Sequence, residues 1–185
     1  MSHLPSDCDV FGVSLEDDDS YNHPPLKIVK NLICKEESTW RTPSYDMIHK
    51  VCVDMVSKMN LQSDTLLVGV ARGGLFPALI ISHLTGLPLA TIHYSSNSGN
   101  GDDKKNTNIG RLPNLPSNKI LLIDDLSDSG NTLNDLKTHY ESIGRKVETA
   151  VVLYKETTNG KHIPTYYGVK VPEDFGWITF PYEQG

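Results

Sequence analysis

The stretch LLIDDLSDSGNT, residues 121–132, decides the fold class of this 185-residue chain. An apolar run leads into two adjacent aspartates, Asp124 and Asp125, and a small polar turn follows before helical spacing begins. This order predicts a buried strand, a turn and then a helix. Because the free N–H groups at the start of a helix bind phosphate, we expect an anion site at the turn around Gly130.

The polar residues of this turn favour a phosphorylated sugar as ligand. Ser129 and Thr132 add hydroxyl donors, and Gly130 allows a ligand to approach the backbone closely. The two aspartates, which come just before the turn, suit sugar hydroxyls or a hydrated Mg²⁺.

Other loops with similar residues fit the stretch less well. An EF-hand loop counted from Asp125 fails because Ser127, Ser129 and Leu136 occupy its third, fifth and twelfth positions. The chain has no GxxxxGK[ST] motif, so it contains no Walker A loop. A plain capping turn would explain Ser129 or Thr132 but not the paired aspartates.

Strands and helices alternate on both sides of the stretch. Strands are expected at 66–70, 89–94, 119–124 and 147–154, and helices at 43–59, 75–85 (beginning near Pro77) and 131–143. Residues 95–118 show little hydrophobic pattern and are expected to form a long loop, and the last 30 residues to form short strands and turns. The alternation predicts an α/β fold, a parallel sheet with helices on both faces, whose ligands bind at the carboxyl ends of the strands.

Composition excludes several classes of protein. The hydrophobic content of 38% suits one globular domain, and no apolar run approaches the roughly 18 residues of a membrane span. No signal peptide is visible, and the three cysteines form no CxxC pair, so we expect a reducing, cytoplasmic setting without a disulfide framework.

The net charge of −6 is concentrated at the N-terminus. Residues 1–26 hold six acids and no Lys or Arg, while the remainder holds 17 acids and 17 basic residues. Neither part carries the basic surface that a nucleic-acid partner requires. We expect residues 1–36 to be an acidic, partly extended N-terminal extension and residues 37–185 to be the domain.

LLIDDLSDSGNT resembles the PRPP-binding signature of the type I phosphoribosyltransferases, and the resemblance extends from about Trp40 to the C-terminus. It implies the type I phosphoribosyltransferase fold: a central, mostly parallel sheet flanked by helices, a flexible hood loop and a small C-terminal base-binding segment. The hood corresponds to residues 95–118, in which Tyr94, Ser95 and Ser96 only loosely match the Ser-Tyr element of the family, and Lys104 and Lys105 receive no role.

The resemblance also implies a PRPP site. Its members are Arg72, Gly73, Asp124, Asp125, Asp128, Ser129, Gly130, Asn131 and Thr132. VGVARGGLFPALIISHLTG, residues 68–86, resembles the pyrophosphate-loop region of the xanthine-guanine enzymes, which often contains a cis peptide. Asp124 and Asp125 would take the ribose hydroxyls and the cofactor Mg²⁺, directly or through water.

The base-binding residues indicate a 6-oxopurine. By resemblance, Lys155 donates to the purine O6, Trp177 stacks on the base, the backbone of Ile178 reads its edge, and Asp128 is the catalytic general acid/base near N7. The implied activity is purine salvage: transfer of the phosphoribosyl group from PRPP to N9 of hypoxanthine, guanine or xanthine, giving the nucleoside 5′-monophosphate and pyrophosphate.

Two alternatives stay open. One is a pyrimidine-type phosphoribosyltransferase, and the other is a non-catalytic regulator that senses PRPP or a nucleotide on the same fold. The resemblance further implies a homodimer or homotetramer, because such assemblies are usual in the family.

Overall fold

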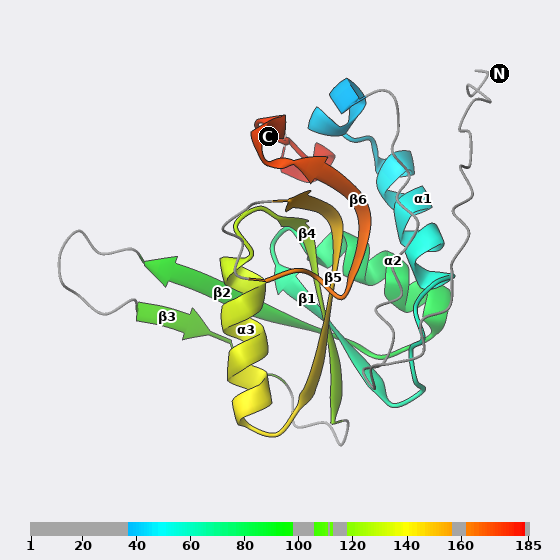
Figure 1. Cartoon of the computed structure of the whole chain (residues 1–185). Helices are drawn as coiled ribbons and strands as arrows, with labels where there is room; N and C mark the ends of the chain where they lie inside the picture. Colours follow the sequence, from blue (N-terminus) through cyan, green and yellow to red (C-terminus); the bar gives the residue numbers. More distant parts are fainter. Residues whose placement is uncertain (1–36, 98–105, 111, 113–117, 157–161, 184–185) are drawn as a thin grey trace, which may run out of the picture.

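The computed structural model describes residues 37–97, 106–110, 112, 118–156 and 162–183. The predicted acidic extension, residues 1–36, lies outside this part, as do Lys104 and Lys105 of the expected hood. The described residues form a six-stranded sheet with helices packed against it (Figure 1).

The elements alternate as the sequence predicts. The strands are β1 (Thr65–Ala71), β2 (Leu89–Asn97), β3 (Asn106–Ile109), β4 (Lys119–Ser127), β5 (Lys146–Glu156) and β6 (Tyr166–Pro172). The helices are α1 (Tyr45–Val56), α2 (Leu75–Thr85) and α3 (Asn131–Ser142), with the short 3-10 helices η1 (Glu37–Arg41), η2 (Glu173–Phe175) and η3 (Pro181–Glu183).

The sheet has the strand order β3-β2-β1-β4-β5-β6, in which β2, β1, β4, β5 and β6 are parallel and β3 is antiparallel. The predicted α/β fold with a mostly parallel sheet is therefore confirmed. Since β1 pairs with both β2 and β4, and β4 with β5, the carboxyl ends of these strands meet at one edge. The turn after β1, the turn after β4 and the end of β5 all lie at that edge.

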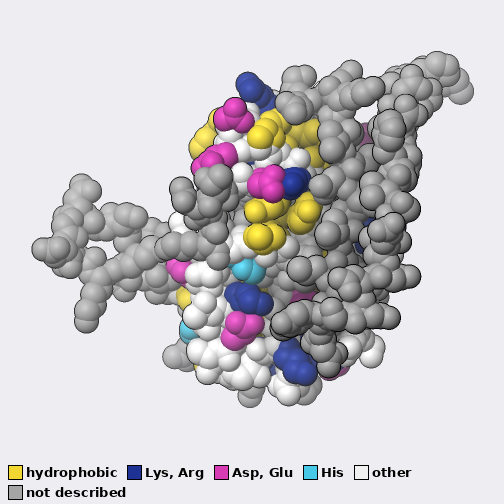
Figure 2. Space-filling view, viewed as in Figure 1, with side chains coloured by type: hydrophobic (Ala, Val, Ile, Leu, Met, Phe, Trp, Pro, Cys, Tyr) yellow, Lys and Arg dark blue, Asp and Glu magenta, His cyan; other side chains and the backbone are white. Residues whose placement is uncertain are grey.

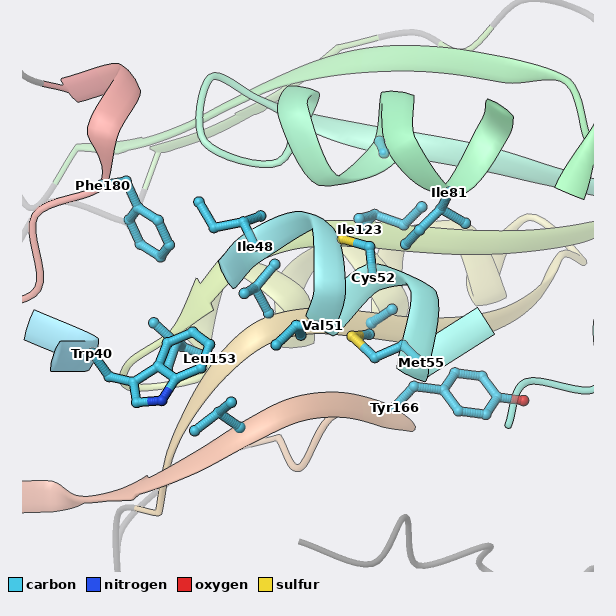
Figure 3. Close-up of a cluster of buried hydrophobic side chains, with 14 of the residues drawn as sticks. Trp40, Ile48, Val51, Cys52, Met55, Ile81, Ile123, Leu153, Tyr166 and Phe180 are labelled. Carbon is cyan, nitrogen blue, oxygen red and sulfur yellow. The ribbon is translucent and has the colours of Figure 1, made fainter. Parts of the chain in front are cut away.

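Helices cover both faces of the sheet. α1 and α2 bury one face, where Ile48, Cys52 and Ile81 pack on Ile123 of β4 (Figure 3). α3 covers the opposite face through Leu133, Leu136 and Tyr140. With both faces covered, the central strands are largely buried, as β1 illustrates: every residue of this strand except Ala71 is buried.

The C-terminal segment completes the first of these two cores. Phe180 packs near Ile48, and Trp40 of η1 lies on the same side of the cluster (Figure 3). The backbone N–H of Thr179 donates to the carbonyl of Arg41 at 2.8 Å. This hydrogen bond connects the C-terminal segment to η1, the first described element of the chain.

The strand that carries the acids is longer than expected. The sequence predicts an end at Asp124, but β4 continues to Ser127 because Leu126 and Ser127 pair with Leu153 and Tyr154 of β5. The two aspartates therefore lie within the strand, and the turn proper begins at Asp128.

The expectation of a structureless loop at 95–118 is wrong in part. β2 extends to Asn97, and β3 pairs with it in antiparallel register, with Tyr94 opposite Ile109. The two strands form an arm that projects from the body of the molecule (Figure 1). Backbone hydrogen bonds hold β3 against β2. The paired residues are mostly polar, so the sequence shows no alternation of apolar and polar residues that would predict the two strand ends. Residues 98–105 lie outside the described part.

The bounds 75–85 expected for the second helix are confirmed: α2 spans Leu75–Thr85 and holds Pro77 within its first turn, where the missing N–H of proline is not needed. The third helix ends one residue earlier than expected. Ile143 does not join the buried stripe of α3: it follows the helix and is 61% exposed.

None of the described helices has the length and hydrophobicity needed to cross a bilayer. On the described surface in Figure 2, acidic and basic side chains are interspersed rather than gathered into a basic stripe.

Candidate functional site

The turn after β4 leads directly into the start of a helix, where the first backbone N–H groups have no partner within the helix itself. α3 is 12 residues long and begins directly after Gly130, which has a φ of 72° and provides no side-chain cap. Only glycine adopts this φ without strain. A Cβ at this position would also lie 2.8 Å from the carbonyl oxygen of His162. This is the geometry expected of an anion-binding helix start.

The side chains of this turn leave polar atoms available. Ser129 Oγ accepts from the side chain of Asn131 at 2.9 Å. Ser127 Oγ and Asn131 Oδ1 are buried without a hydrogen-bond partner among the described residues. Asp128, Ser129, Gly130, Asn131 and Thr132 thus lie consecutively across the strand end and the first turn of α3, as the sequence predicts.

Asp124 and Asp125 form a close acidic pair. The backbone N–H of Asp125 donates to Asp124 Oδ1 at 3.0 Å. Burial, followed by the charge of Asp125, raises the pKa of Asp124 well above its usual value. Burial also raises the pKa of Asp125, although the hydroxyl of Tyr182 opposes this shift by donating to its carboxylate.

This pair is chemically suited to a hydrated cation. Two buried carboxylates in contact require a proton or a cation to offset their repulsion. Within the described residues no cluster of three or more His, Cys, Asp or Glu side chains could enclose a metal. An ion at Asp124 and Asp125 would therefore take its other ligands from water and substrate, which is the binding mode typical of Mg²⁺.

The turn after β1 approaches the acidic pair. Its peptide bond between Ala71 and Arg72 is cis, and a Cβ on Gly73 would overlap the carboxylate of Asp125. Only glycine fits there unless the acid moves. The Arg72 side chain is exposed and forms no ion pair within the described part of the chain.

Lys155, at the end of β5, reaches the turn after β4. Its Nζ lies 3.1 Å from Asp128 Oδ1, and the residue is 8% exposed. The Asp128 side chain is 64% exposed. A nearly buried ammonium group thus projects into the site and is paired with a carboxylate that remains open to solvent. It is not a solvated lysine at a strand end.

Trp177 and Ile178 have opposite environments. Trp177 is 82% exposed, whereas Ile178 is buried in the core beneath it. A core tryptophan is therefore excluded at position 177, whereas the side chain of Ile178 belongs to the core. An exposed aromatic ring on an anchored segment can stack on a flat base.

Tyr182 is a site residue that the sequence reasoning missed. Its hydroxyl donates to Asp125 Oδ2 at 2.9 Å across 57 positions of sequence. Nothing in the local sequence FPYE signals a partner so far away. Of the predicted residues, those after β1, those at the end of β4 and in its turn, and Lys155 at the end of β5 lie at one edge of the sheet.

This geometry can be compared with protein families and known structures. Residues 44–184 match the family model of the phosphoribosyl transferase domain. The xanthine-guanine phosphoribosyltransferase of Cereibacter sphaeroides is 29% identical over 150 residues, which cover 76% of this chain and 84% of that protein.

Solved structures share the fold. A purine phosphoribosyltransferase from Pyrococcus horikoshii has a TM-score of 0.63 at 24% identity, covering 78% of this chain and 93% of that one. The xanthine-guanine-hypoxanthine phosphoribosyltransferase of Helicobacter pylori has a TM-score of 0.61 at 24% identity, covering 77% and 93%. The family match spans most of the chain and contains every predicted site residue, so the chain belongs to the phosphoribosyl transferase domain family.

Proposed function

We propose that this protein transfers the 5-phosphoribosyl group of PRPP to N9 of a 6-oxopurine, namely hypoxanthine, guanine or xanthine. The ion pair between Lys155 and Asp128 is the observation that carries the choice of base. It joins a cation from β5 to the first acid of the phosphate turn, at the edge where the sugar would lie.

The chemistry of this pair complements one edge of a 6-oxopurine. O6 is a hydrogen-bond acceptor and the neighbouring N7 can carry a proton. Lys155 would donate to O6 while Asp128 accepts at N7, so the base would replace the direct contact between the two side chains. A 6-aminopurine would present donors to the ammonium group instead, and a pyrimidine has no N7.

PRPP would occupy the rest of the edge. The N–H groups of residues 128–132 would bind the 5′-phosphate, and Arg72 with the backbone at Gly73 would bind the pyrophosphate, for which a guanidinium fork is well suited. Asp124 and Asp125 would contact the ribose hydroxyls. Trp177 would stack on the base.

The transfer breaks the bond between C1′ and the pyrophosphate oxygen and forms the bond between C1′ and N9. Carboxylates beside the ribose stabilise the positive charge that develops on the sugar. Asp128 takes the proton that the base loses. Asp124 and Asp125 would hold Mg²⁺, directly or through water, and the ion would supply charge neutralisation at the leaving pyrophosphate.

Pyrophosphate release tests the proposal. The protein is incubated with Mg²⁺ and PRPP, and release is compared for hypoxanthine, guanine, xanthine, adenine, uracil and orotate. We expect release with one or more 6-oxopurines and none with adenine or the pyrimidines. Release with uracil or orotate alone would make the protein a pyrimidine-type enzyme. PRPP binding without release with any base would favour a ligand-sensing regulator.

A further inference from the structure

The hydroxyl of Tyr182 is held in place by the packing of its ring. The ring is stacked on Phe180, with centroids 5.4 Å apart and planes 9° apart, and it lies against Phe76 at 5.7 Å. From this position the hydroxyl donates to Asp125 Oδ2 at 2.9 Å. Because the packed ring holds the Tyr182 hydroxyl in one position, the hydroxyl can fix the orientation of the Asp125 carboxylate.

Asp125 is confined on its opposite side by the turn after β1. Gly73 lies so close that a Cβ there would overlap the carboxylate. The residue is 8% exposed. The carboxylate therefore lies between two segments, the turn at 72–74 and the C-terminal segment at 177–183, and has little room to rotate.

The hydrogen bond has one direction. The phenol hydroxyl of Tyr182 donates, and Oδ2 of Asp125 accepts. Glu183 accepts from the backbone N–H of Phe180 at 3.1 Å and so is directed toward the backbone of its own turn.

We propose that Tyr182 is a positioning residue for Asp125, which sets this carboxylate in the orientation that binds the ribose of PRPP. The contact also joins the segment carrying Trp177 to the half of the site that takes PRPP. This inference rests on the proposed function, because it assigns Asp125 to the sugar.

A purely structural role for Tyr182 can be separated from this one. Tyr45 contacts the same Phe76 ring at 5.0 Å, and its hydroxyl forms no hydrogen bond that involves the described residues. Tyr45→Phe therefore removes a hydroxyl from the same aromatic group without affecting an acid, and it is the matched control for Tyr182→Phe.

The test measures binding and kinetics together. The Kd of Mg²⁺–PRPP is determined by calorimetry without a base, and the KM values of PRPP and of the preferred base are determined by pyrophosphate release. A hydrogen bond to a charged group contributes more than a neutral one, so we expect Tyr182→Phe to raise the Kd and KM of PRPP on the order of tenfold. The KM of the base should change less than about twofold, because the base and the Asp125 carboxylate would occupy separate parts of the site that do not couple.

A second variant links the effect to Asp125. In an Asp125→Ala background, which lacks the acceptor, adding Tyr182→Phe should change the PRPP Kd by less than about twofold, since the two residues act through one contact. Unfolding midpoints of all variants are recorded, and binding is measured well below the lowest one.

Three outcomes would overturn the inference. Tyr182→Phe could bind PRPP like Tyr45→Phe, or its effect could persist in full beside Asp125→Ala. The KM values of PRPP and base could also rise together with a fall in the midpoint, which would make Tyr182 a support of the whole C-terminal segment. A wild-type protein that does not bind PRPP would contradict the proposed function instead, and one that binds PRPP without turnover still allows the Kd comparison.

Discussion

The carboxylate of Asp128 has two proposed roles. It forms an ion pair with Lys155, whose Nζ lies 3.1 Å from its Oδ1, and in the proposed reaction it receives a proton from the base. Both depend on its carboxylate, so its replacement by the isosteric amide isolates the charge.

We predict that Asp128→Asn lowers kcat by a factor of about 10²–10⁴, the usual contribution of a general acid or base. The Kd of Mg²⁺–PRPP should change little, because in the proposed complex the backbone N–H groups, and not this carboxylate, bind the phosphate. Pyrophosphate release and calorimetry measure the two quantities.

Glu156→Gln is the control for that experiment. Glu156 is the next residue along β5 after Lys155, but it pairs with Lys170 at 2.8 Å. Its replacement removes an acid nearby without changing the pair at the site, so turnover should stay near the wild-type value. Unchanged turnover in Asp128→Asn would remove Asp128 from the mechanism.

The prediction of individual site residues from the sequence depended on how local their signal was. Asp124 to Thr132 are consecutive, and a strand followed by a helix positions them without further information. Lys155 and Trp177 were found only through resemblance to a family. Tyr182 was missed because its role depends on a contact with Asp125 that the tertiary fold creates.

At the scale of elements, the turn after β1 packs closely against strand β4, and Gly73 is the residue that contacts the Asp125 carboxylate. No left-handed φ is found there, unlike at Gly86, Gly130, Gly144 and Gly176. An alanine at position 73 is therefore disfavoured by its overlap with Asp125 and not by backbone strain.

We predict that Gly73→Ala displaces the Asp125 carboxylate and weakens Mg²⁺–PRPP binding at least about tenfold, the scale expected when a charged contact is lost. Calorimetry measures the Kd, and thermal unfolding measures any accompanying loss of stability.

Gly86→Ala is the control variant for Gly73→Ala. Gly86 has a φ of 70°, and an added methyl group would meet nothing within 4 Å, so its replacement costs on the order of 1 kcal/mol of stability through backbone strain. It should leave PRPP binding unchanged. Wild-type affinity in Gly73→Ala would show that the turn and the acid adjust independently.

Elements were predicted well where a hydrophobic pattern marks them and poorly where backbone pairing alone does. β1 and α1 were predicted close to their observed bounds. β3 was not found, and the end of β4 was placed too early. In both cases the additional residues are held by neighbouring strands, which a single segment cannot reveal.

At the scale of the whole molecule, stability should depend on pH through His162. Its ring lies 2.8 Å from Thr149 Oγ1. Burial, and then the charge of Lys137, lower its pKa from 6.5, while Glu141 opposes this shift. The unfolded chain therefore binds this proton more readily than the folded protein does.

We predict that the contribution of His162 to the free energy of unfolding is complete above pH 6.5 and is lost as the pH falls toward the lowered pKa of the folded state. Denaturant unfolding of the wild type and of His162→Gln between pH 5 and 8 tests this. The difference in stability between the two should narrow toward low pH. A constant difference would contradict the prediction.

The extent of the domain and its assembly remain predictions. We propose that residues 37–185 fold as one domain and that the acidic residues 1–36 lie outside it. The homo-oligomer and the cytoplasmic setting are likewise proposed from the sequence.

The hydrogen bond from Thr179 to Arg41 has a consequence for how activity responds to heat. It ties the C-terminal segment to η1, while the hydroxyl of Tyr182 ties the same segment to Asp125 of β4. A segment outside the sheet opens locally at a lower free energy than the central strands do. One opening event would withdraw both Trp177 and Tyr182, and the observed rate would equal the rate of the closed form multiplied by the closed fraction. Warming would then abolish activity while the sheet is still folded, and cooling would restore activity without refolding of the domain.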